Sequence, residues 1–236
     1  MDNAPPLSPT ARSTIRRGAK RARTDRATLY ALLDSCLICH FATIRDGVPL
    51  VVPTGYGREG DKLYLHGSTG AASLMDAAGT APISINVTRV DGVVYARSVF
   101  HHSMNYASAV IIGEAVPITA STDKLAALRV ITEHIAPGSW NATRQPTRKE
   151  LAKTGVLAIS LHEASVKMRS GPPGDDEEDL SAHREWAGVL PLHQQWGAPQ
   201  PCPLLPADTP VPDRVSKRPL PGEPAPSPSG TGHRLT

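Results

Sequence analysis

The sequence predicts a mainly β fold, a β-barrel with peripheral helices. About seven short segments alternate between apolar and polar residues, which is typical of half-buried strands. Turn residues separate most of these segments directly, without a helix between them, and helical periodicity is confined to three places. Strands that pair with their neighbours in this way favour an antiparallel barrel over alternating βαβ units.

The first half of the chain predicts a helix, three strands and a second helix. The first helix spans residues 25–35, with Thr24 or Asp25 as its cap, and three strands follow within residues 40–67. A short helix is expected over residues 69–79. The inward face of the first helix carries Leu29, Leu32 and Leu33, and the strand turns are Asp46-Gly47 and Glu59-Gly60-Asp61.

The second half predicts a hairpin, a long strand, a helix and two final strands. Residues 82–90 and 91–100 indicate a hairpin that turns at Asp91-Gly92. The remaining elements are a strand over 105–118 that bends at Gly113, an amphipathic helix over 121–136 capped by Ser121 or Thr122, with Leu125, Leu128 and Ile131 facing inward, and two strands within 154–170.

Both ends of the chain differ in composition from its middle. Residues 1–20 form a flexible basic arm in this interpretation, residues 21–197 the barrel domain, and residues 198–236 a disordered Pro-rich tail. The tail holds eleven of the 23 prolines, which lack the backbone N–H that a helix or a sheet ladder needs.

Charge and cysteine content narrow the function classes. A net charge of +3 does not by itself indicate a nucleic-acid partner, and we interpret the cluster of Arg and Lys in residues 12–26 as a solvated arm rather than a phosphate or nucleic-acid contact. Three cysteines suggest a reducing compartment, and buried thiols explain Cys36 and Cys39 better than a zinc or redox site does. Without an apolar run of about 20 residues or a signal peptide, we expect a soluble, cytoplasmic protein with no membrane contact.

The segment 63–75 indicates an anion pocket that lacks a cation. A strand ends in His66, and Gly67, Ser68 and Thr69 follow before an expected helix begins. Amides and hydroxyls in such a turn suit phosphate oxygens, yet the sequence holds no Lys or Arg between Lys62 and Arg89. His66 itself fits a ligand contact, an acid/base group or a metal ligand, and equally a histidine satisfied by backbone at a strand end.

A second polar concentration covers residues 97–108. Burying so many polar side chains at a strand corner is costly unless they face water or a ligand, and alternation puts His101 and His102 on opposite faces. Downstream, charge changes sign from Lys167 and Arg169 to the acidic run 175–179, which fits a helix cap or a solvated face better than a metal site. Trp186 fits either stacking on a planar cofactor or packing at a subunit seam.

Together these segments resemble the FMN-binding split-barrel superfamily, the pyridoxamine-5′-phosphate-oxidase-like proteins, and in particular the branch that includes the nitroimidazole-resistance flavoproteins. The matching motifs run in order from "TDRATLYALLD" through "CHFATIRDGVPLVVPTGY", "LYLHGST", "ARSVFHHSMNY" and "KMRSGPPGDDEED" to "WAGVLPL". They cover about residues 20–195 and identify the family jointly, but no single one of them identifies a reaction.

The resemblance implies a homodimer with two sites at the subunit seam, each holding FMN. The phosphate would lie near His66–Ser73, and the flavin ring near Pro53–Tyr56 and the partner's Trp186. The implied catalytic residues are His66 and His102. The implied cofactor contacts are Pro53, Thr54, Tyr56, His66, Gly67, Ser68, Thr69, Ser73, Arg97, His101, Ser103, Asn105, Tyr106, Lys167, Arg169 and Trp186.

The sequence departs from the family where relatives carry basic residues. Ala71, Ala72 and Ala107 occupy those regions, and losing two charge-assisted hydrogen bonds of about 1.5–3 kcal/mol each would weaken flavin binding by roughly two to four powers of ten. Lys62, Arg97, Lys167 and Arg169 are the cations available to compensate.

Three functions follow from this resemblance. The first is an FMN-dependent oxidoreductase that reduces a nitro group or a related group of a small molecule. The second is a haem-binding split barrel with a histidine axial ligand, for which His66, His101 and His102 are candidates, carrying out oxidative tailoring of a metabolite. The third is a non-enzymatic flavin carrier or regulator. Deazaflavin is a further cofactor candidate, and nucleic-acid binding is disfavoured because the basic arm lacks aromatic residues.

Overall fold

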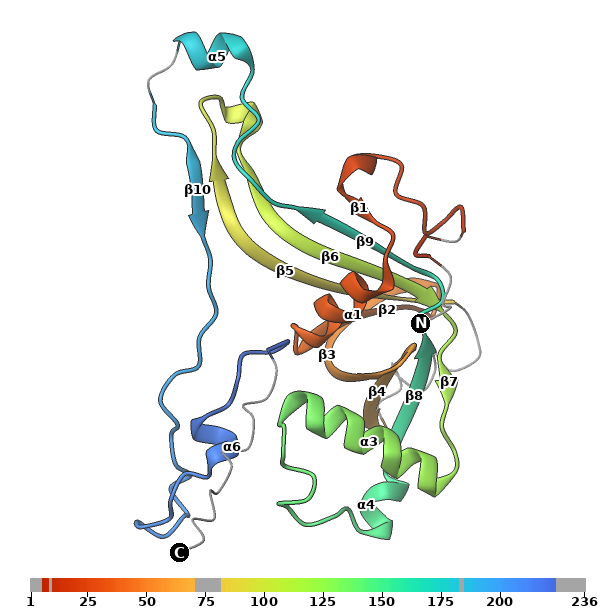
Figure 1. Ribbon diagram of the computed structural model, residues 1–236. Helices are drawn as coiled ribbons and strands as arrows, with labels where there is room; N and C mark the ends of the chain where they lie inside the picture. Colours follow the sequence, from red (N-terminus) through yellow and green to blue (C-terminus); the bar gives the residue numbers. More distant parts are fainter. Residues whose placement is uncertain (1–5, 9, 71–81, 183–184, 224–236) are drawn as a thin grey trace, which may run out of the picture.

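The computed structural model describes residues 6–8, 10–70, 82–182 and 185–223. Within these residues the strands form one ten-stranded antiparallel sheet in the order β1-β9-β6-β5-β2-β3-β4-β8-β7, and β10 pairs with β5 (Figure 1). This confirms the predicted mainly β fold with peripheral helices. The strands are β1 (Ala22–Arg23), β2 (Ile38–Arg45), β3 (Val48–Glu59), β4 (Lys62–Ser68), β5 (Ile83–Tyr95), β6 (Ser103–Gly113), β7 (Val116–Pro117), β8 (Thr154–Ser160), β9 (Ala164–Arg169) and β10 (Gly188–Pro191).

The helices lie at the periphery, as predicted. They are α1 (Arg26–Asp34), α3 (Ser121–Ile135), α4 (Arg148–Ala152), α5 (Glu177–Ala182) and α6 (Asp213–Ser216), with 3-10 turns η1 (Ala19–Arg21) and η2 (Val99–His101). The expected Asp25 cap is confirmed, because its side chain accepts from the Thr28 amide. The expected side-chain cap of α3 is wrong: Ala120 occupies the cap position. The helix expected over 69–79 lies mostly outside the described residues.

The strand β3 changes partners along its length and so joins the two parts of the curved sheet. Its first two thirds pair with β2, from the Asp46-Gly47 turn, where both residues have positive φ, to Gly55. From Tyr56 to Glu59 it pairs with β4 instead. The core lies inside this curved sheet and includes the three leucines expected on α1, together with Phe41, Tyr56, Leu63, Leu65, Ile85, Ile111, Leu157 and Ile159.

The strands β5, β6 and β9 extend beyond the barrel as a long bent arm, with η2 and α5 at its far end (Figure 1). The predicted hairpin turn at Asp91-Gly92 is wrong, because β5 continues through these residues with a register irregularity between Val90 and Gly92. A Cβ at Gly92 would lie 2.8 Å from the Leu190 carbonyl oxygen, so the residue admits the close approach of β10. The expected long strand over 105–118 is also divided, because β6 ends at Gly113 and β7 follows.

Parts of both terminal segments contact the domain. The N-terminal segment ends in β1, which pairs with β9. In the C-terminal segment, the Arg218 guanidinium lies 4.2 Å from the Trp196 ring centroid and donates to the Ile135 carbonyl oxygen. The division of the chain into arm, domain and tail stays a prediction. None of the helices in the described ranges is long and apolar enough to cross a membrane.

Candidate functional site

The candidate site lies where β3 and β4 separate. The last pair that joins β3 to β4 is Tyr56 with Leu65. On the N-terminal side of Tyr56, β3 pairs with β2 instead. On the C-terminal side of Leu65, His66–Ser68 of β4 pair with Val156–Thr154 of β8. The two groups of residues predicted to hold the flavin ring and phosphate therefore border the same opening in the sheet. A long-range change of strand partner, rather than a local motif, creates this opening.

His66 stands at this opening with an exposed side chain and no hydrogen-bond partner among the described residues. Partial desolvation lowers the pKa of its imidazole, which favours the neutral form. A neutral imidazole has one nitrogen free to accept a proton or to ligate a metal. His66 therefore keeps the chemical capacity that the sequence predicted for it.

Some of the amides and hydroxyls expected to bind an anion after His66 are already hydrogen-bonded within the chain. The Thr69 amide and hydroxyl both donate to the Lys153 carbonyl oxygen, at 2.9 and 3.2 Å, and the Ser68 hydroxyl accepts from the Gly70 amide. These contacts also bring Lys153 next to the opening. Lys153 is exposed, and it is a cation near this segment that sequence reasoning missed, because 84 positions separate it from Thr69. Ser73, also predicted to bind cofactor, lies outside the described residues.

Residues of β2 and β3 form the other border of the opening. Pro53 is exposed and pairs with His40 of β2, whose exposed side chain shares the outer face. Thr54 is half-buried, whereas Tyr56 is fully buried and its hydroxyl donates to the Leu33 carbonyl oxygen at 2.5 Å. Its burial leaves Tyr56 no surface for the predicted ring contact. His40 was not predicted, although strand alternation places it opposite the buried Cys39 and Phe41.

The second group of predicted residues lies at the far end of the arm. The Arg97 amide and guanidinium donate to Asp175 at 2.9 and 2.7 Å, and His101 lies 3.0 Å from Asp176. Desolvation acts to raise the pKa of Asp175, but the Arg97 contacts outweigh it and the pKa is lowered. Arg97 is thus occupied by a carboxylate, and the acidic run serves to hold the tip together.

His102 is oriented by the backbone. Its Nδ1 accepts from the Ala96 amide at 2.8 Å, so in the neutral ring Nε2 carries the proton and is the available donor. Its ring also lies 6.0 Å from that of Tyr95, which in turn lies 6.0 Å from Trp186. His102 and Trp186 therefore belong to one aromatic group on the arm.

Further predicted contacts lie along β6 and β9. Tyr106 pairs with Arg169 and Ser103 with Val94. The Arg169 guanidinium donates to Asn105 Oδ1 and to the carbonyl oxygens of Gly171 and Pro172, so its partners there are neutral. Asn105 is buried, and Ala107, where the resemblance led us to expect a basic residue, lies in the core.

Within one chain the structure does not bring the two groups together. The strands β5, β2 and β3 stand between β6 and β4 in the sheet, and the arm tip points away from the barrel (Figure 1). The predicted catalytic pair, His66 and His102, is therefore separated.

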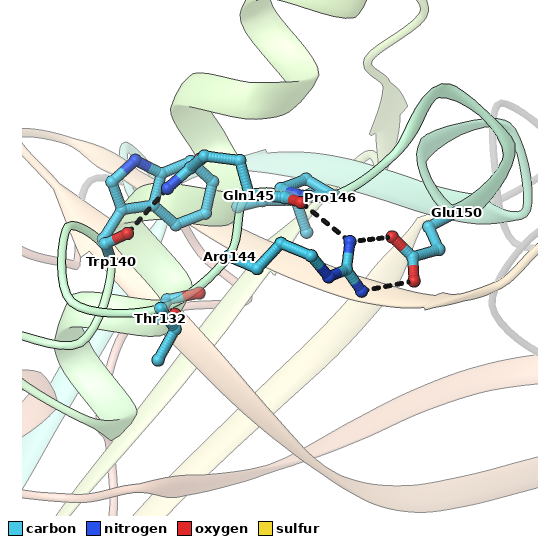
Figure 2. Close-up of a pocket in the computed structure, with 8 residues that line it drawn as sticks. Thr132, Trp140, Arg144, Gln145, Pro146 and Glu150 are labelled. Atoms are coloured by element: carbon cyan, nitrogen blue, oxygen red, sulfur yellow. Dashed lines mark hydrogen bonds and ion pairs between the residues drawn. The ribbon is translucent and has the colours of Figure 1, made fainter.

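A hollow of about 290 Å³ beside the α3–α4 loop is a different feature (Figure 2). Polar groups that line it bind one another: Arg144 forms an ion pair with Glu150 at 2.8 Å, and the Gln145 side chain donates to the Trp140 carbonyl oxygen at 2.6 Å. Glu150 also completes a capping box with Thr147. These contacts stabilise the loop between α3 and α4, and none of the predicted site residues lines the hollow.

The family model for pyridoxamine 5'-phosphate oxidase matches residues 25–168, more than half of the chain. The chain belongs to the pyridoxamine 5'-phosphate oxidase family. This confirms the predicted family and its split-barrel fold. Among curated proteins, none matches this member of the family.

Two solved structures resemble this family member over most of its length. The flavocytochrome Anf3 from Azotobacter vinelandii is 36% identical with a TM-score of 0.85, covering 90% of this chain and 98% of its own. The FAD and heme binding protein from Mycobacterium smegmatis is 42% identical with a TM-score of 0.80, covering 84% and 96%. A 5-nitroimidazole antibiotic resistance protein from Bacteroides thetaiotaomicron is 21% identical with a TM-score of 0.52, covering 62% and 85%, a likeness that concerns the fold alone.

Proposed function

We propose that this protein is a flavin- and haem-binding redox protein, an oxidoreductase acting on a small molecule. The observation that carries this proposal is its similarity, at 36% and 42% identity over most of both chains, to proteins named as a flavocytochrome and as an FAD and heme binding protein. Flavin and haem, which the sequence analysis treated as alternatives, are therefore proposed to bind to the same protein. The flavin is proposed to be FAD in place of the expected FMN.

The opening between β3 and β4 is the proposed flavin site. Thr54, Gly67 and Thr69 border it, and Lys153 supplies a nearby positive charge in place of the basic residues that are missing from the sequence. A flavin bound there supplies hydride and electron transfer, while the protein orients it and sets its electrostatic surroundings.

His66 is the proposed axial ligand of the haem iron. It is exposed at the opening, has no hydrogen-bond partner among the described residues, and has a lowered pKa that favours the neutral, ligating form. His134 is less suitable because its Nε2 already lies 2.8 Å from the Cys36 carbonyl oxygen.

A homodimer is proposed to complete the site. Leu190, Val93 and Met104 are paired across three strands of the arm, and together with Tyr95 and Trp186 they form an apolar stripe whose members are 40–68% exposed. Apolar patches of this kind mark interaction surfaces. In this proposal a second copy covers the stripe, and the partner's arm supplies the His102 and Trp186 that the single chain holds apart from His66.

The test is the visible spectrum of the purified protein before and after adding FAD, FMN and haemin. We expect flavin absorption and a Soret band, with FAD identified by chromatography of the cofactor released by acid. The variant His66→Ala is expected to lose or shift the Soret band and retain the flavin, and Lys153→Gln to weaken flavin binding about tenfold, one charge-assisted contact. His193→Ala, in the exposed C-terminal segment, is the control. A protein that binds neither cofactor contradicts the proposal, and an unchanged Soret band in His66→Ala removes the ligand assignment.

A further inference from the structure

The basic N-terminal segment, residues 6–23 where described, is anchored to the sheet by backbone hydrogen bonds and strand pairing. Leu7 is buried in the core cluster and its amide donates to the Thr24 carbonyl oxygen at 2.8 Å, while the Ser8 amide donates to the Ala164 carbonyl oxygen at 2.8 Å. The strand β1 then adds to the edge of β9, where Ala22 pairs with Lys167. Its cations are therefore carried by a backbone that is fixed at both ends.

Two of the cations in residues 12–26, Arg12 and Arg26, are paired with carboxylates. Arg12 makes two hydrogen bonds to Glu163, at 2.7 and 2.6 Å, and the Thr10 hydroxyl donates to the same carboxylate. These contacts hold the pKa of Glu163 at about 2. Arg26 is buried and donates to Asp61 and to two backbone carbonyl oxygens.

Six other cations form a patch, the basic face, on the segment and the adjoining strand β9. In the described part of the chain, none of them lies within ion-pair distance of a carboxylate. Lys167 donates to the Arg17 carbonyl oxygen at 2.9 Å, and burial followed by the charge of Arg21 lowers the pKa of Arg169. The basic face consists of Arg16, Arg17, Lys20, Arg21, Lys167 and Arg169, of which the first four are exposed.

Holding like charges together without counter-charges is unfavourable, so the arrangement suits an anionic partner. The four exposed cations stand on an open surface, whereas small-molecule sites are concave, so the partner suited to it is a macromolecule. Residues 6–26 contain no aromatic residue on which bases would stack, and they contribute an edge strand and a 3-10 turn rather than a groove-binding helix. An acidic protein surface fits the basic face better than a nucleic acid.

We propose that the basic face is the docking surface for an acidic electron-donor protein. This inference rests on the proposed redox function. A reduced donor transfers one electron per encounter and is itself oxidised; two encounters reduce the bound cofactor by two electrons, and protons come from water. Charge complementarity steers such partners and permits a small, short-lived interface.

The test measures the binding of two probes, an acidic [2Fe–2S] ferredoxin and a flavodoxin, to the full-length protein as purified. The variant Arg16→Gln/Arg17→Gln/Lys20→Gln is expected to weaken binding about tenfold, and the wild-type affinity is expected to fall steeply with salt. The control, Arg129→Gln/Arg148→Gln/Lys149→Gln, removes the same charge from the exposed surface of α3 and α4 and is expected to change binding less than about twofold. Thermal unfolding checks that both variants are folded.

Binding of neither probe overturns the inference, as does an equal loss in both triple variants. A second result would overturn the inference in favour of a nucleic-acid partner. In that case duplex DNA binds more tightly than either probe, its binding depends on salt, and the Arg16/Arg17/Lys20 variant loses it. Dithionite reduction reports on the proposed flavin without any donor. If dithionite reduces the protein but neither probe binds it, the docking surface alone fails; if the probes bind a protein without a reducible chromophore, the redox function fails.

Discussion

At the scale of single residues, two histidines have pKa values shifted in the same direction but differ in their hydrogen-bond partners. Desolvation lowers the pKa of both His66 and His134. His134 is half-buried and packs against the core residue Tyr56 with 4.8 Å between ring centroids, and its Nε2 lies 2.8 Å from the Cys36 carbonyl oxygen, so its ring is held by the fold. His66 has no such partner in the described residues and remains available for a ligand.

The lowered pKa of His134 predicts acid-dependent stability. Because the unfolded chain binds the proton more readily, stability is fully present above the ordinary histidine pKa of 6.5 and is lost as the pH falls below it. We expect the free energy of unfolding, from guanidinium titrations, to decrease from pH 7.5 to pH 5.5 and to decrease less in His134→Gln. His193→Gln is the control, and a variant with the wild-type pH slope would contradict this account.

At the scale of elements, α3 packs on the sheet through a glycine. A Cβ at Gly57 of β3 would lie 2.7 Å from the Ile131 backbone nitrogen and Cα, so only glycine allows this contact between helix and strand. At Gly113, at the end of β6, an added Cβ would lie 3.6 Å from Ile159 Cγ2, an ordinary contact distance.

This difference predicts that a Gly-to-Ala substitution lowers the stability of the protein more at Gly57 than at Gly113. Gly57→Ala is expected to destabilise the protein by about 1–3 kcal/mol, because helix and strand must move apart. Gly113→Ala is expected to cost less than about 1 kcal/mol. Chemical denaturation measures both, and equal effects would show that α3 is not held by close contact at Gly57.

At the scale of the whole molecule, the arm separates the two predicted parts of the site. The arm extends away from the barrel (Figure 1), and the apolar stripe on the arm is exposed in the single chain. A second copy both covers the stripe and completes the site in the proposed assembly. The basic face lies on β1, β9 and the segment before them, whereas the stripe contains residues of β5, β6 and β10.

Disrupting the stripe is expected to dissociate the proposed dimer. Val93→Glu introduces a charge between Leu190 and Met104, and we expect light scattering after gel filtration to report a monomer with weakened flavin binding. Val116→Glu, on the exposed edge strand β7, is the matched control. A variant that stays dimeric and binds flavin normally would place the subunit contact elsewhere.

The sequence predicted those features that depend on neighbouring residues. Alternation and turn residues predicted β2, β3 and β4, and leucine spacing predicted the buried face of α1, because each depends on local backbone geometry. The same reasoning failed at Asp91-Gly92, where a glycine that suits a turn instead admits the backbone of β10 from about 100 positions away.

The sequence by itself determined the strands β2, β3 and β4, the buried face of α1 and the family. Only the tertiary structure decided which polar groups are free. It placed Lys153 beside Thr69 across 84 positions, held Arg12 on Glu163 across 151, occupied Arg97 and Tyr56 with other partners, and left His66 without one among the described residues. The physical reason is that residue spacing fixes the face on which a side chain lies, whereas its partners depend on strand register and chain closure between segments far apart in the sequence.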